Sequence, residues 1–293
     1  MSTDNSLIVS TSVARSVEDV IGTGRYVQRS RSEGSTCGPL RRIGVIYDRW
    51  VPESNGAASS VNPQEPPVRP EEGSAKAGPR LRGVITDWGG VMTNPMAETM
   101  NAWLDADGID RKSYAAAIRP WLAQAYGAAG HGNPVHALER GEWGHEEFER
   151  VLAGQLVRFD GQPVVPDGLL NRMFAASTME VAMRELMWAL RKAGVRTALL
   201  SNSWGGTGYP RDLFPEMFDV VVISSEVGMR KPEEEIFRHA AALLGLEPEE
   251  CVFIDDIEAN VLAAEAVGLV GVHHREPSRT AERLGQLLGI RLA

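Results

Sequence analysis

Residues 83–91 read Gly-Val-Ile-Thr-Asp-Trp-Gly-Gly-Val and place a single carboxylate at the end of a short apolar run. The run predicts a buried strand, and the glycines at 89 and 90 predict a tight turn directly after Asp87. An aspartate at such a junction is most often a turn former or a helix cap. The context of Asp87 favours a catalytic role, because three further segments follow in fixed order: residues 199–202, 230–232 and 253–256.

The sequence after residue 80 alternates short apolar runs with helical patterns, which predicts an α/β fold with a doubly wound parallel sheet. The run Val220–Ile223 does not alternate with polar residues, as expected for a strand covered on both faces. Strands are expected at 84–87, 197–201, 220–224, 251–255 and 270–273. Helices are expected at 181–192, 233–244 and 259–267, each followed by a glycine that favours helix termination.

The interval 95–179 breaks this alternation and offers helices but no convincing strand. Helical spacing is clearest at 96–104, 114–126 and 146–157. An all-helical insertion after the first strand would lie over the strand ends, where doubly wound sheets bind ligands. We therefore expect a helical cap at 95–179 and a core at 81–94 and 180–293. Cap residues that could select a leaving group, or equally serve packing, are Trp121, Tyr126, His131, His136 and Trp143.

Residues 1–80 are rich in Ser, Pro, Gly and Arg and predict a disordered extension, because they cannot bury enough apolar surface to offset the entropy of ordering. The run at 43–47 could add a strand. Gly22-Thr23-Gly24 has neither a third glycine at the required spacing nor a preceding strand, so we do not interpret it as a dinucleotide-binding motif.

Composition excludes several classes of protein. The net charge is −9, and the first 80 residues hold ten basic and nine acidic groups, so the body is acidic and no nucleic acid is expected as a partner. Two distant cysteines lack metal-ligand spacing and favour a reducing, cytoplasmic location. No segment is apolar enough to span a membrane, so no membrane is expected. The oligomeric state does not follow from the sequence.

Paired acids at Asp255 and Asp256 favour a metal site. Two adjacent carboxylates raise each other's pKa unless a cation compensates them, and Mg²⁺ prefers a few carboxylates together with substrate phosphate. Either acid could instead cap the following helix. Together with Asp87, which could attack phosphorus to form an aspartyl-phosphate, they would meet at one edge of the sheet.

Three further residues complete the candidate site. Lys231 precedes Pro232, which is expected to open a helix, so the lysine is expected at a helix entrance. It could neutralise the nucleophile or the phosphoryl oxygens, although an ordinary surface lysine is commoner. Ser201 and Asn202 end a predicted strand and could donate hydrogen bonds to a phosphoryl group, or simply begin a loop.

In this order and spacing, the four segments resemble the haloacid dehalogenase-like hydrolase superfamily over about residues 81–288. The resemblance implies that Asp87 is the nucleophile, with the Gly89 carbonyl as a Mg²⁺ ligand. It also implies that Asp256 binds the Mg²⁺ ion directly and that Asp255 contacts the ion through a water molecule. Ser201, Lys231 and Asn260 match the family's hydroxyl, lysine and supporting polar positions. The segments 138–142 and 146–148 resemble the cap of the subgroup that includes the phosphatase domain of soluble epoxide hydrolases.

One position departs from the family pattern, because most of its phosphatases carry a general acid where this chain has Gly89. Its absence removes a contribution of about 10²- to 10⁴-fold in rate and favours good leaving groups such as acyl or aryl phosphates. His131 or His136 could supply the proton instead.

The combined expectation is a Mg²⁺-dependent phosphatase acting on a small phosphorylated metabolite. A metal-free haloacid dehalogenase is an alternative that the paired acids Asp255 and Asp256 argue against. A phosphonate hydrolase is another, but it needs a cap lysine, and Lys112 lies in a context that does not match. A non-catalytic binding or regulatory protein on this fold is the alternative from another class.

Overall fold

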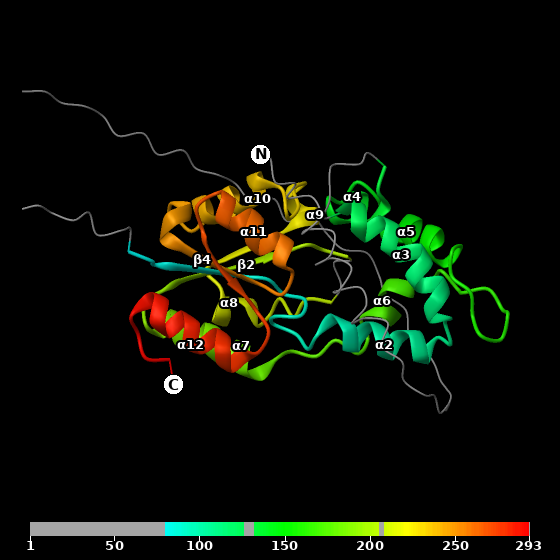
Figure 1. Ribbon diagram of the computed structural model, residues 1–293, viewed down its shortest axis with the longest axis horizontal. Coiled ribbons are helices and arrows are strands. Elements are labelled where there is room, and N and C mark those ends of the chain that lie inside the picture. The colour runs from blue at the N-terminus through cyan, green and yellow to red at the C-terminus, as the bar shows by residue number, and fades with distance from the viewer. Residues whose placement is uncertain (1–79, 126–131, 205–207, 293) are drawn as a thin grey trace, which may run out of the picture. The chain divides into compact units, whose positions relative to one another are not determined.

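The computed structural model describes residues 80–125, 132–204 and 208–292 (Figure 1). The predicted disordered extension, the possible strand at 43–47 and the Gly22-Thr23-Gly24 segment lie outside the described residues, apart from Arg80. Tyr126 and His131 lie outside them as well.

A five-stranded parallel sheet, ordered β3-β2-β1-β4-β5, forms the centre of the fold and confirms the predicted α/β class. In β1, Thr86 pairs with Leu199 of β2 on one side and Ile254 of β4 on the other, so the carboxyl ends of these strands lie level. The strands are β1 (Gly83–Thr86), β2 (Arg196–Ser201), β3 (Val220–Ile223), β4 (Cys251–Asp255) and β5 (Val270–His273).

Helices cover both faces of the sheet, as expected for strands without polar alternation (Figure 1). Val84 and Leu199 pack against α7 (Val181–Lys192), α8 (Phe214–Met217) and α12 (Pro277–Leu288). On the opposite face, Ile85 and Leu200 pack against α10 (Glu234–Leu243) and α11 (Glu258–Ala266). The short elements α9 (Ser224–Val227) and η1 (Pro248–Glu250) complete the core connections.

Between β1 and α7 the chain forms helices that have an apolar cluster of their own, centred on Trp103, Phe148 and Leu169. These inserted helices are α2 (Met96–Ala106), α3 (Arg111–Ala125), α4 (Pro134–Glu139), α5 (His145–Ala153) and α6 (Leu169–Met173). Extended pairing in the described part of this segment is limited to isolated bridges such as Ile109 with Arg158.

The chain enters and leaves the inserted helices through two paired stretches. The Asn94 amide donates to the Thr178 carbonyl at 3.0 Å, and the Thr178 amide donates to Asn94 Oδ1 at 2.8 Å. An antiparallel bridge joins Thr93 and Met179, and the Glu180 amide donates to the Met92 carbonyl at 2.8 Å. The two connections therefore lie side by side.

Some predicted boundaries are wrong for local reasons. Pro232 does not open a helix: α10 begins at Glu234, because Glu233 has an extended ψ of 136°. The helix predicted at 146–157 ends at Ala153, because Gly154 ends it and Val157 pairs with Pro163. Within the described residues, no helix combines the length and apolar character needed to cross a bilayer.

Candidate active site

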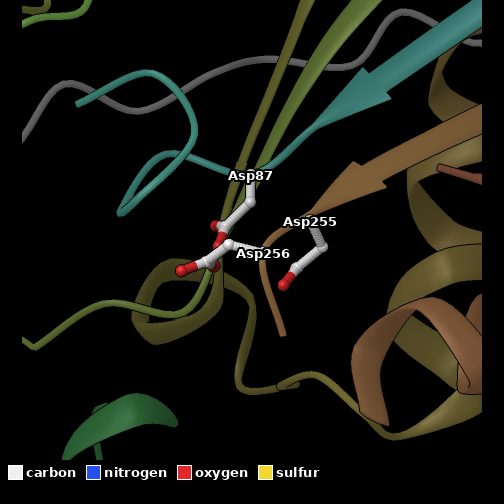
Figure 2. A group of neighbouring side chains, drawn as sticks. All are labelled: Asp87, Asp255 and Asp256. Carbon is white, nitrogen blue, oxygen red and sulfur yellow. The ribbon is translucent and has the colours of Figure 1, made fainter. Parts of the chain in front are cut away.

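Three carboxylates meet at the carboxyl ends of two neighbouring strands. Asp87 follows β1, Asp255 is the last residue of β4, and Asp256 comes next. One oxygen from each of the three lies within 4.8 Å of the others, and Figure 2 shows the side chains gathered at this edge. Because β1 and β4 pair in parallel register, residues far apart in the sequence meet here.

Lys231 supplies the positive charge at this cluster. Its ammonium nitrogen lies 2.7 Å from Asp87 Oδ1 and 2.7 Å from Asp255 Oδ2, and its side chain is 1% exposed. Among the described residues, the ion pairs made by the three carboxylates come from Lys231. One ammonium therefore faces three buried or half-buried acids.

Burial, together with this imbalance, raises the pKa of Asp87 and of Asp256. Burial raises the pKa of Asp87 to about 7, and Lys231 offsets only part of that effect while Asp255 adds to it. Burial, followed by the charges of Asp255 and Asp87, raises the pKa of Asp256 well above its usual range. A buried excess of negative charge is costly unless a cation joins it. The set of oxygen ligands therefore fits a hard divalent ion such as Mg²⁺.

Asp255 is saturated by hydrogen bonds from the protein. Its Oδ1 accepts from the Ile257 amide at 2.8 Å, and its Oδ2 accepts from Lys231. The Asn260 amide lies 3.2 and 3.1 Å from the two oxygens. Asp255 thus steadies the turn before α11 and orients Lys231, while Asp87 and Asp256 have more capacity to bind a ligand.

Asp87 receives its hydrogen bonds on one oxygen. Oδ1 accepts from the Trp88 amide at 2.7 Å and pairs with Lys231. Within the described residues, no donor is recorded on Oδ2. The side chain is thus held by one oxygen with the other placed to coordinate or react.

The two glycines after Asp87 have different neighbours. Gly90 has a φ of +73°, and a Cβ added there would lie 2.3 Å from Asp256 Oδ2, so only glycine lets the turn approach that carboxylate. A Cβ added at Gly89 would instead lie 2.7 Å from the terminal methyl of Met96, the first residue of α2. Position 89 therefore borders the inserted helices.

Ser201 and Asn202 have separate environments at the end of β2. Ser201 Oγ hydrogen-bonds the Tyr209 hydroxyl at 2.8 Å. The Asn202 side chain instead donates to the Lys231 carbonyl at 2.9 Å and accepts from the Lys231 amide at 2.8 Å. Asn202 therefore holds the backbone of Lys231, whereas the sequence suggested either a hydrogen bond to a phosphoryl group or only the start of a loop.

The inserted helices also contact the core next to Lys231 through Glu139, the last residue of α4. Its buried carboxylate accepts from Arg230 Nε at 2.5 Å and from Trp204 Nε1 at 2.9 Å. Its carbonyl also accepts from Ser224 Oγ at 2.5 Å. Burial raises the pKa of Glu139, and Arg230 lowers it in part.

The sequence analysis placed Glu139 in the cap-like segment 138–142 without giving it a role, and it missed Tyr209. A glutamate at the end of the apolar stretch Pro134–Glu139 is a possible signal. A helix of six residues is too short, however, for its apolar residues to define a helical period. Tyr209 follows Gly208 in a polar loop and carried no signal. Of the predicted cap residues, Trp121 and Trp143 pack against the cluster of the inserted helices, and His136 is buried in α4.

Comparison with known proteins agrees with this geometry. A family model described as haloacid dehalogenase-like hydrolase matches residues 81–268. The chain is 29% identical to rat bifunctional epoxide hydrolase 2 over 128 residues, which cover 41% of this chain and 23% of the rat protein. It is 33% identical to a sesquiterpene phosphatase of Aspergillus oryzae over 113 residues, covering 38% of this chain and 58% of that protein.

These matches span less than two thirds of each relative's length. Among solved structures, a HAD family enzyme of Bacteroides thetaiotaomicron, in complex with magnesium and inorganic phosphate, is 20% identical with a TM-score of 0.46. That match covers 67% of this chain and 94% of the enzyme.

Proposed function

Because the chain belongs to the haloacid dehalogenase-like hydrolase family, we propose that it is a Mg²⁺-dependent phosphatase of a small phosphorylated metabolite, with Asp87 as its nucleophile. The observation that carries the proposal is the buried excess of carboxylate beside one lysine. The sesquiterpene phosphatase among the relatives supports phosphoryl chemistry over other hydrolyses.

In the proposed reaction, Asp87 attacks the phosphorus atom as the bond to the leaving oxygen breaks, giving an aspartyl-phosphate. A water molecule then hydrolyses this intermediate, releasing inorganic phosphate and restoring the carboxylate. Lys231 balances charge on Asp87, and Ser201 donates to a phosphoryl oxygen. Asp255 and Asn202 act indirectly by holding Lys231.

Asp87, Asp256 and the Gly89 carbonyl would hold the metal ion. When bound, Mg²⁺ would neutralise both the excess carboxylate charge and the phosphoryl oxygens. The raised pKa values of Asp87 and Asp256 support this assignment, because they reflect burial and, after it, neighbouring negative charge that Lys231 offsets only in part.

We also propose that residues 95–179 act as a cap that selects the leaving group. Two contacts support it: Met96 lies beside position 89, and Glu139 pairs with Arg230 next to the catalytic lysine. With an apolar methyl rather than an acid beside Gly89, the proposed substrates are acyl or aryl phosphates, whose leaving groups need little protonation.

Gly89→Asp tests the leaving-group proposal. An added carboxyl is expected to speed alkyl-phosphate hydrolysis more than aryl-phosphate hydrolysis, once the Met96 methyl has moved aside. The double variant with Met96→Ala makes that space and is the matched control. If the alkyl-to-aryl rate ratio stays at the wild-type value in both variants, another residue already supplies the proton.

The decisive experiment measures phosphate release from a panel of small phosphate esters and acyl phosphates with Mg²⁺. We expect Asp87→Asn to lose activity by about 10³-fold or more, because the attacking oxygen is replaced by an amide. Asp160→Asn removes an exposed aspartate outside the site and serves as the control. Activity that survives in Asp87→Asn would rule out the nucleophile.

The same experiment separates the alternatives. Halide release from haloacids that persists in EDTA would indicate the metal-free dehalogenase. Absence of turnover on every substrate, with Mg²⁺ still binding, would indicate a non-catalytic binding protein.

A further inference from the structure

Tyr209 places a phenol at the candidate site without any role in the proposed reaction. Its hydroxyl lies 2.8 Å from Ser201 Oγ, at the end of β2. Its ring packs against Trp88, with the centroids 5.7 Å apart, and against Phe214, with the centroids 6.1 Å apart. Because Trp88 directly follows Asp87, this aromatic group fixes the phenol beside the nucleophile's own turn.

The hydroxyl of Tyr209 has a second partner, the side chain of Ser203. Ser201 and Ser203 are 2% and 1% exposed, so bulk water contributes little to hydrogen bonding at either residue. Three hydroxyl groups thus form a hydrogen-bonded series in the order Ser203, Tyr209, Ser201, in which both serines are buried and the tyrosine is half-buried.

Each hydroxyl has one hydrogen to donate and two lone pairs to accept, so the hydrogen bonds among the three hydroxyl groups can run in either of two directions. A phenol is a stronger donor than an aliphatic alcohol, because it is the more acidic of the two. Burial raises the pKa of Tyr209 to about 12, so the phenol keeps its hydrogen at neutral pH. With Ser203 donating to Tyr209 and Tyr209 donating to Ser201, each bond strengthens the next.

We propose that Tyr209 is a positioning residue that donates to Ser201 Oγ and thereby leaves the serine's own hydrogen for an oxygen of the phosphoryl group. This inference rests on the proposed function, in which Ser201 binds that group. Tyr209 acts through Ser201 and fixes the direction of a single hydrogen bond. The phosphoryl site thus gains an oriented donor.

The effect should appear in phosphate binding as well as in turnover. In Tyr209→Phe, the Ser201 hydroxyl loses the partner that orients it and can rotate away from the phosphoryl oxygen. We expect kcat/KM for an aryl phosphate to fall about 10-fold and inhibition by inorganic phosphate to weaken by a similar factor, as for loss of one neutral hydrogen bond.

A double-mutant cycle tests the pairing, using Tyr209→Phe, Ser201→Ala and the double variant. If Tyr209 acts through Ser201, the double variant should be no worse than Ser201→Ala, in both kcat/KM and the inhibition constant for phosphate. Tyr114→Phe is the matched control, since it removes a buried phenol that packs on Trp103 among the inserted helices. It should leave both constants unchanged.

Multiplicative losses in the double variant, or wild-type constants in Tyr209→Phe, would overturn the inference. Ser203→Ala interrupts the series from its other end and is expected to reduce kcat/KM about 2- to 5-fold, so the inference stays testable if Tyr209→Phe does not fold. A wild-type protein that releases no phosphate would instead refute the proposed function, before any variant is compared.

Discussion

Arg230 and Lys231 are adjacent cations with very different surroundings. Both side chains are almost fully buried, at 2% and 1% exposure. Within the described residues, Arg230 forms an ion pair with Glu139, which also accepts from the Trp204 indole. Lys231 faces Asp87 and Asp255, with Asp256 close by.

The difference teaches how to tell a structural ion pair from a ligand site. The pair of Arg230 and Glu139 is balanced in charge and joins the inserted helices to the core. The cluster around Lys231 carries two carboxylates beyond what one ammonium can balance. Burial alone does not mark a binding site, whereas buried charge without a counterion does.

Breaking the balanced pair should give the largest effect on stability. Glu139→Ala leaves Arg230 buried without its carboxylate, and we expect the free energy of unfolding to fall by about 3–5 kcal/mol. Chemical denaturation of wild type and variant measures the difference. Replacing both partners by methionine removes both charges and should restore most of the loss, whereas an equal loss in the double variant would mean that the ion pair itself stabilises the fold.

The unbalanced cluster should make stability depend on pH in Mg²⁺-free buffer. The pKa of Asp87 is raised to about 7 in the folded protein. The contribution of the protonated Asp87 side chain to the free energy of unfolding is therefore fully present below pH 4 and is lost as pH rises through 7. The stability of wild type relative to Asp87→Asn should therefore fall by roughly 2–4 kcal/mol between pH 4 and pH 8. Denaturation across this range measures it, and a difference that is constant with pH would contradict the charge imbalance.

Binding of Mg²⁺ should recover the stability that the protein loses through the excess of carboxylate charge. At 100 times its Kd, the ion should stabilise wild type by about 2.7 kcal/mol. At a fixed Mg²⁺ concentration, the stabilisation should be larger at pH 8 than at pH 6, because the ligands must be deprotonated to bind the ion. Asp256→Asn should lose most of this stabilisation while unfolding at a higher temperature than wild type without metal. Thermal denaturation with and without Mg²⁺ distinguishes the two effects, with Asp160→Asn expected to behave as wild type.

The smallest effect on stability is expected for a partly exposed ion pair between the inserted helices and the core. Arg140, directly after α4, pairs with Glu233 before α10, and their side chains are 27% and 32% exposed. Arg140→Ala should change the free energy of unfolding by less than about 1 kcal/mol, because water screens the pair. A loss as large as that of Glu139→Ala would show that position, rather than burial, sets the cost.

The sequence predicted the fold well where one signal dominated. The unbroken apolar run of β4 ended at the predicted residue, Asp255, and α7 matched at both ends. Helix starts were less predictable, because proline permits several turn geometries: a turn closed by the Glu233 amide on the Arg230 carbonyl at 2.9 Å delays α10 past Pro232.

Side-chain roles were harder to predict than positions. The sequence placed Asn202 at a strand end but could not show that its amide binds the backbone of Lys231, 29 residues later. The roles of Glu139 and Tyr209 were not predicted, because their partners, Arg230 and Ser201, are identified only by the folded contacts. Such contacts depend on the folded geometry, which spacing along the chain does not encode.

The paired connections at Thr93–Met179 and Asn94–Thr178 make the chain leave the core and return to it at one place, while the Glu139–Arg230 pair adds a second, side-chain contact. Since the chain departs and returns at the same place, an insertion of any length could be grafted there without altering the register of β1 or α7. Evolution or a protein engineer could exchange the whole set of inserted helices in one step and keep the carboxylate cluster at the edge of the sheet.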